Sequence, residues 1–153
     1  MVFPIHLAIR WLHVLSVALL LGGAVLAWVS LRRIGEVERR ERYGEYAVAV
    51  AAGYERLFWG AAGVAVMTGV GNLGALAPGL PPSDSAWGLA LTVKLAGVLG
   101  LLLAAVPRTL LVARCDEAAG ATGRRVRTLR RGYGATALYL TGVLGLAEVL
   151  AHG

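Results

Sequence analysis

The chain has 153 residues, of which 58% are hydrophobic and 16% are charged, and its formal net charge is +6. A soluble domain contains about 45–50% apolar residues, so this composition excludes an ordinary soluble protein and indicates a single membrane domain over residues 1–153. The arginines follow a membrane pattern, which argues against nucleic acid as a partner. The single cysteine, Cys115, excludes an internal disulfide and a paired-cysteine metal site.

Four segments of the chain are long and apolar enough to cross a bilayer, which takes about 20 mostly apolar helical residues. They cover residues 5–31, 47–77, 87–106 and 133–151. Pro107 can end or kink the third segment, unless the helix continues towards Arg114. Because the connections are short, the sequence predicts an all-α protein, an integral membrane four-helix up-and-down bundle.

Basic residues gather in or beside two of the three connections, while the remaining connection, PGLPPSDSA, has none. The positive-inside rule then places both basic connections in the cytoplasm and both termini on the extracytoplasmic side. This predicts a multi-pass protein of the cytoplasmic (inner) membrane. The run RRVRTLRR is interpreted either as a topology signal or as a site for anionic lipid headgroups. The basic residues concerned are Arg32, Arg33, Arg39, Arg40, Arg42, Arg56, Arg108, Arg114, Arg124, Arg125, Arg127, Arg130 and Arg131.

The first apolar segment carries three polar residues, His6, Arg10 and His13, in its first half. His6 and His13 are seven residues apart and fall on nearly the same helix face, with Arg10 between them on the same broad stripe. Ionisable groups at membrane depth avoid lipid. We therefore expect this stripe to face the interior of the bundle.

Polar side chains of the other segments fall at a similar predicted depth. Lys94 matches the depth of His13, Thr68 lies near the outer end of the second segment, and Glu148 and His152 share a face of the last one. The inner halves contain mainly Leu, Val, Ala and Gly. The sequence therefore predicts a polar cluster in the outer half of the bundle.

Imidazole is the commonest side-chain metal ligand and the usual axial ligand of haem iron. His13, His6 and His152 are therefore candidate metal ligands. His6 and His13 are about 10 Å apart along one helix and cannot hold one iron from opposite sides. A second ligand would come from Lys94, from His152 or from a second subunit, which leaves a homodimer open.

The remaining polar residues suit supporting roles. Arg10 could pair with a haem propionate, and Glu148 could act as a charge partner or a proton-transfer group. Structural alternatives stay open: His6 can be interfacial, His152 can lie in a frayed helix end, and Arg10 can reach the headgroups or pair with Glu148.

The stretches WLHVLSVALLLGGAVL, YERLFWGAAGVAVMTGVGNL and LTVKLAGVLGLLLAAVPRTLL resemble spans of CopD-type copper-resistance membrane proteins and of the related HemJ-type protoporphyrinogen oxidases. The resemblance covers residues 11–114. It implies that His13 and Lys94 correspond to positions associated with haem binding and activity in the HemJ-type proteins. The CopD-type proteins are linked to copper homeostasis.

These observations leave several functions open. The first is binding of b-type haem, or of another metal, with a role in electron transfer or sensing and with a redox partner. The alternatives are copper uptake or resistance, an oxidoreductase of the protoporphyrinogen oxidase kind acting on a porphyrin, and a scaffold whose polar cluster only fixes helix register.

Overall fold

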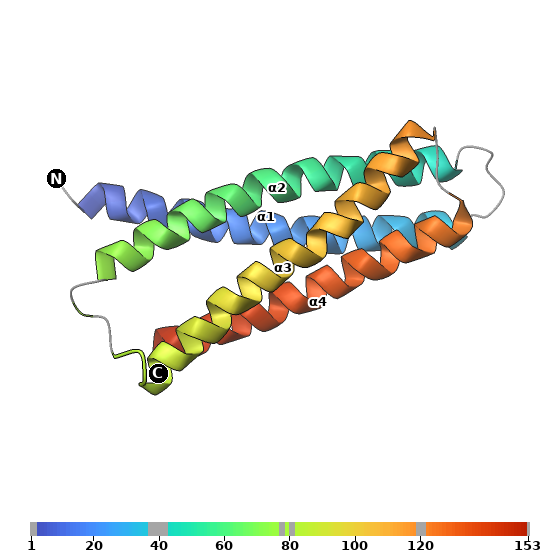
Figure 1. The fold of residues 1–153 in the computed structure, drawn as a ribbon. Helices are drawn as coiled ribbons and strands as arrows, with labels where there is room; N and C mark the ends of the chain where they lie inside the picture. Colours follow the sequence, from blue (N-terminus) through green and yellow to red (C-terminus); the bar gives the residue numbers. More distant parts are fainter. Residues whose placement is uncertain (1–2, 37–42, 77–78, 80–81, 119–121, 153) are drawn as a thin grey trace.

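The computed structural model consists of four long helices, and the described residues contain no strand (Figure 1). It describes residues 3–36, 43–76, 79, 82–118 and 122–152. The helices are α1 (Phe3–Glu36), α2 (Tyr43–Leu76), α3 (Ala86–Glu117) and α4 (Gly123–His152). At about 1.5 Å per residue each is roughly 45–50 Å long, more than the ~30 Å hydrocarbon thickness of a bilayer. The all-α prediction is confirmed.

Three of these helices, α1, α2 and α3, are long and apolar enough to cross a membrane. The fourth helix, α4, begins with an arginine-rich segment and becomes apolar from about Tyr133 onwards. Its crossing of the membrane stays a prediction. The chain is thus a multi-pass membrane protein in which α4 packs against α1 and α3.

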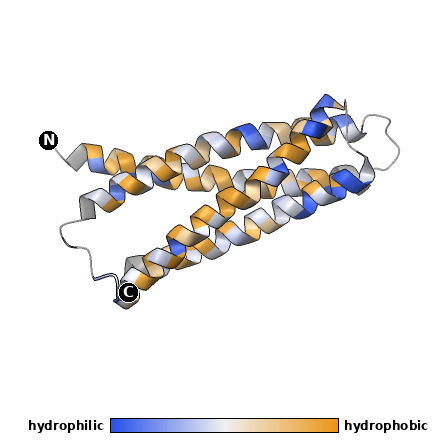
Figure 2. Ribbon diagram, viewed as in Figure 1, coloured by the Kyte–Doolittle hydropathy of each residue, from blue (hydrophilic) through white to orange (hydrophobic). Residues whose placement is uncertain are grey.

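The helices run up and down, as predicted. Figure 1 shows both termini at one end of the bundle, together with the α2–α3 connection. The end of α1, the start of α2, the end of α3 and the start of α4 lie at the opposite end, where Figure 2 shows hydrophilic residues gathered on the helix ends. We call these the terminal end and the basic end. That the basic end is cytoplasmic remains a prediction.

Local chemistry explains where α3 begins. Ser85 caps it, because the amide of Gly88 donates to the Ser85 hydroxyl oxygen over 3.1 Å. Gly88 has to be small, since a Cβ there would lie 2.6 Å from the carbonyl oxygen of Pro82. At its other end α3 passes through Pro107 and continues to Glu117, so Pro107 does not end the helix and the alternative of a continued helix is correct. The bounds of the membrane-crossing segments stay predictions.

The apolar core lies mainly towards the basic end. Its largest fully buried side chains are Leu31, Phe58, Cys115, Val126, Leu129 and Tyr133. Towards the terminal end, large apolar residues of α1 such as Trp11 and Val14 are mostly exposed, and within the described residues the backbone of α1 does not come close to that of α3. Figure 1 shows the α1–α2 pair diverging from the α3–α4 pair in this direction. The bundle is therefore closely packed at the basic end and open at the terminal end.

Candidate functional site

His13 lies between α1 and α2 in the more open half. Its Nδ1 atom is 2.9 Å from the carbonyl oxygen of Ala65 and 3.1 Å from the hydroxyl oxygen of Thr68. The Thr68 hydroxyl lies 2.6 Å from the Val64 carbonyl oxygen, to which it can donate. His13 is seven residues before Leu20, which is buried in the core, so both lie on the core-facing stripe of α1.

These contacts determine which ring nitrogen of His13 carries a free lone pair. A carbonyl oxygen only accepts hydrogen bonds, so Nδ1 must carry the proton that it shares with Ala65. In a neutral imidazole the lone pair then lies on Nε2. Such a backbone contact on one nitrogen is the usual way to orient a histidine that binds metal through the other.

The backbone of α2 is shaped around this ring. A Cβ at Gly69 would lie 3.3 Å from Cε1 of His13, closer than most real contacts. A residue larger than glycine would therefore press on the imidazole. Hydrogen bonds at Nδ1 orient the ring, and the lack of a side chain at Gly69 leaves the space that the ring occupies.

Lys94 lies on α3, one helix away from the α1–α2 pair that holds His13. Its side chain is half-buried. It precedes Leu101, Arg108 and Cys115 at intervals of seven residues, and all three are buried, so it continues the core-facing stripe of α3. The predicted proximity of His13 and Lys94, like their roles, stays a prediction.

His6 and Arg10 do not face the interior, so that expectation is wrong. Both side chains are exposed. Arg10 is three residues from His13, so its side chain is rotated from that of His13 by about 60° around α1. It lines a shallow surface pocket of about 270 Å³ together with Leu7, Trp11 and Val14. His6 lies about two turns from His13 towards the terminal end, where the large side chains of α1 are mostly exposed. Any role of these two residues in binding a cofactor stays a prediction.

Two further predicted site residues, Glu148 and His152, lie near the end of α4. The Glu148 side chain is exposed. The His152 side chain lies outside the part of the chain whose side chains the structure describes. Their roles as charge partner and metal ligand stay predictions.

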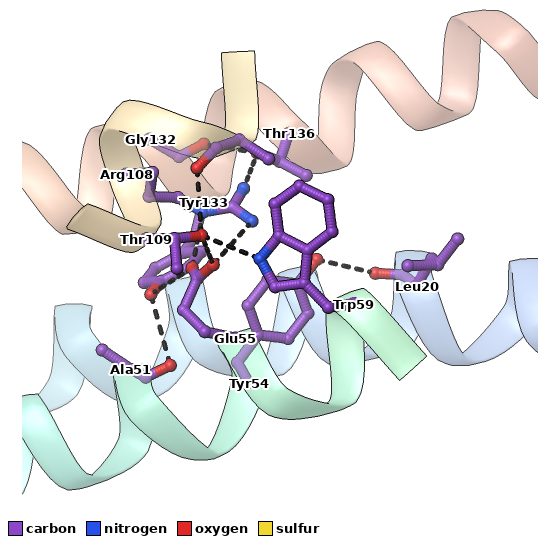
Figure 3. Close-up of polar contacts among 11 residues, drawn as sticks. Leu20, Ala51, Tyr54, Glu55, Trp59, Arg108, Thr109, Gly132, Tyr133 and Thr136 are labelled. Atoms are coloured by element: carbon purple, nitrogen blue, oxygen red, sulfur yellow. Dashed lines mark hydrogen bonds and ion pairs between the residues drawn. The ribbon is translucent and has the colours of Figure 1, made fainter. Parts of the chain in front are cut away.

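A second polar cluster joins α2, α3 and α4 nearer the basic end (Figure 3). Arg108 and Glu55 form an ion pair, with Nε 2.6 Å from Oε1. Arg108 also donates to the Thr136 hydroxyl over 2.5 Å, and Tyr133 donates to Glu55 over 3.1 Å. The Thr109 hydroxyl donates to the second carboxylate oxygen of Glu55 over 2.5 Å.

Aromatic rings surround the guanidinium group of Arg108. Its Cζ atom lies 4.7 Å from the ring centroid of Phe58, 5.1 Å from that of Tyr133 and 5.4 Å from that of Tyr54. Cations are attracted to the faces of such rings, most strongly where water is excluded. Within the described residues every buried side-chain nitrogen and oxygen has a hydrogen-bond partner. This cluster is therefore complete without a ligand.

Sequence reasoning missed this cluster. It treated Arg108 only as a topology signal in or beside a connection, whereas α3 continues past Pro107 and buries this side chain. The spacing of Lys94, Arg108 and Cys115 by multiples of seven could have indicated that Arg108 faces inwards. Glu55 could then have been recognised as the acidic partner that a buried arginine requires.

Few metal-ligating side chains surround His13. The described residues contain no group of three or more His, Cys, Asp and Glu side chains that could hold a metal ion. A metal at Nε2 of His13 would therefore take its other ligands from Lys94, from backbone oxygens or from a group that it brings with it.

Comparison with known families gave a match over most of the chain. The family described as copper resistance protein D matches residues 48–150, which is more than half of the chain. No curated protein and no solved structure matched.

Proposed function

The chain belongs to the copper resistance protein D family, and on that premise we propose that it takes part in copper homeostasis by binding copper at Nε2 of His13. The match itself begins at residue 48 and does not include His13. The binding site is therefore argued from the geometry of this chain.

The observation that carries the proposal is the hydrogen bond from Nδ1 of His13 to the Ala65 carbonyl oxygen. It leaves Nε2 as the lone-pair donor in a half-buried position. Imidazole nitrogen suits copper in both common oxidation states. A neutral amine on Lys94 could add a second nitrogen, whereas its protonated form would repel the metal ion.

The small number of protein ligands supports transfer of copper rather than permanent storage. A metal that is passed on has to be held strongly enough to enter a site and weakly enough to leave it. One oriented imidazole in a loosely packed part of the bundle fits that requirement. We therefore treat copper as the transported or buffered species and not as a resident cofactor.

A second candidate ligand is b-type haem, and the same scarcity of ligands favours it. A porphyrin supplies four nitrogen ligands to its iron, so the protein needs to supply only one or two axial groups. His13 would be the axial ligand through Nε2, with the chemistry of electron transfer supplied by the haem. The exposed guanidinium of Arg10 could pair with a propionate.

The experiment is to purify the full chain in detergent, supply copper or haem, and measure bound copper by elemental analysis and haem by its absorption spectrum. His13→Ala is compared with His6→Ala, a matched control on the same helix with an exposed side chain. We expect copper binding to fall at least about tenfold in His13→Ala and to persist in His6→Ala.

The other outcomes separate the candidates. A Soret band that disappears only in His13→Ala, with no bound copper, would support haem and refute the copper proposal. Equal copper binding by the wild type and His13→Ala would refute the copper proposal, and an unchanged Soret band in His13→Ala would refute the haem candidate. Thermal unfolding of each variant in detergent shows whether a loss of binding comes from a loss of folding.

A further inference from the structure

The first three turns of α4 carry a basic surface that the proposed function does not use. Arg124, Arg127, Thr128 and Arg131 line an open surface pocket of about 400 Å³. We call this surface the α4 arginine face. All four side chains are exposed.

This face points away from the bundle. The residues of the same helix segment that pack into the core are Val126, Leu129 and Tyr133, and all three are fully buried. By helical geometry they lie on the opposite side from Arg127 and Arg131. The α4 arginine face is therefore turned towards whatever surrounds the bundle.

The three guanidinium groups gain little from the protein itself. None of them forms an ion pair or a side-chain hydrogen bond with a described residue, and the residues lining the pocket include no carboxylate. Arginines three and four residues apart on one helix repel each other. This arrangement costs stability unless an anion lies among the three charges.

The position of the face along α4 indicates which anion this is. The apolar part of α4 begins at about Tyr133, directly after Arg131. If α4 enters the bilayer there, the α4 arginine face lies at the level of the lipid headgroups, where phosphates are concentrated. Guanidinium groups bind phosphate oxygens in pairs and with defined geometry.

We infer that the α4 arginine face is a binding site for the phosphate headgroup of an acidic phospholipid in the adjacent leaflet. The Thr128 hydroxyl, which now donates to the Arg124 carbonyl oxygen over 3.2 Å, lies among the arginines and can turn to donate to the phosphate. This site is separate from the copper site proposed above and does not depend on it.

The test is native mass spectrometry of the full chain in detergent, titrated with phosphatidylglycerol or with phosphatidylcholine. The double variant Arg127→Gln/Arg131→Gln is compared with Arg56→Gln/Arg114→Gln. The control pair removes the same charge from exposed positions on α2 and α3. We expect the apparent Kd for phosphatidylglycerol to rise about fivefold for each arginine removed from the face, roughly 25-fold for the pair, and to change less than about twofold in the control.

Three outcomes would overturn the inference. Equal losses in the two double variants would show general charge attraction and no site. Equal binding of phosphatidylcholine and phosphatidylglycerol would show that the acidic headgroup is not recognised. Displacement of phosphatidylglycerol by millimolar inorganic phosphate would assign the face to free phosphate and not to lipid. A circular dichroism spectrum of each variant checks that α4 remains helical.

Discussion

Nε of Arg108 lies 2.6 Å from Oε1 of Glu55, and both side chains are more than nine-tenths buried. The two residues are on α3 and α2, and Tyr133 and Thr136 connect the pair to α4. A buried ion pair need not stabilise a fold relative to apolar residues, but removing one partner leaves an unpaired charge. This relationship makes the cluster a sensitive point for the stability of the bundle.

We predict that Arg108→Ala lowers the free energy of unfolding by about 3–5 kcal/mol, because Glu55 is left buried and without its cation. The measurement is denaturant titration of the protein in micelles. Arg114→Ala on the same helix is the control, since Arg114 is exposed, and it should cost less than about 0.5 kcal/mol.

The double variant Glu55→Leu/Arg108→Met separates the cost of the unpaired charge from the cost of lost packing. It replaces both charged partners by apolar side chains, so no charge is left buried without its counter-ion. This double variant should therefore be more stable than Arg108→Ala in the same titration. A double variant that is less stable than Arg108→Ala would contradict this account.

Tyr133 provides a second test of the same cluster. Its hydroxyl donates to the Glu55 carboxylate over 3.1 Å and its ring is fully buried. Tyr133→Phe should cost about 1.5–3 kcal/mol, the usual contribution of a hydrogen bond to a charged group. Tyr139→Phe removes a hydroxyl that donates to the Gly97 carbonyl oxygen from an exposed position, and it should cost no more than about 1 kcal/mol. Similar losses of unfolding free energy in the two variants would show that the hydrogen bond from Tyr133 to Glu55 contributes no more to stability than one at an exposed position.

Two adjacent glycines of α1 should respond in opposite ways to the same substitution. A Cβ at Gly23 would lie 2.8 Å from Cε2 of Tyr54, whereas a Cβ at Gly22 would meet nothing within 4 Å. Gly23→Ala should therefore cost about 1–3 kcal/mol by forcing α1 and α2 apart. Gly22→Ala should be neutral or stabilising by up to about 1 kcal/mol, because alanine favours helix. The same denaturant titration measures both, and a destabilised Gly22→Ala would show that the packing of α1 differs from that described.

The fold could be predicted from the sequence because lipid imposes a simple pattern. Apolar runs long enough to cross a bilayer determine the helices, and short connections determine their antiparallel order. The ends of the helices were harder to predict from the sequence. Pro107 follows the predicted third segment, yet α3 continues to Glu117, because the neighbouring helices and side chains of a membrane bundle can support a proline within a helix.

The candidate site was predictable only in part. Charge at membrane depth indicated that His13 faces inwards, and its half-buried side chain lies against α2. The same reasoning was wrong about the orientation of His6 and Arg10, because it assumed a bundle closed at both ends, whereas the helix pairs diverge towards the terminal end. Nothing in the sequence alone indicates that the Ala65 carbonyl oxygen orients the ring of His13.

The contact between Gly69 and His13 allows a test of the copper site that does not remove the ligand. A Cβ at Gly69 would lie 3.3 Å from Cε1 of His13 and would tilt the imidazole away from its hydrogen bond with Ala65. Loss of such an orienting contact commonly weakens metal binding by about 10–100-fold, and we expect Gly69→Ala to weaken copper binding within this range. Gly63→Ala on the same helix is the matched control, since a Cβ there would meet nothing within 4 Å. Both variants gain the same helix propensity, so equal copper affinities, measured by competition with a chromogenic chelator, would show that the orientation of His13 does not matter for the metal.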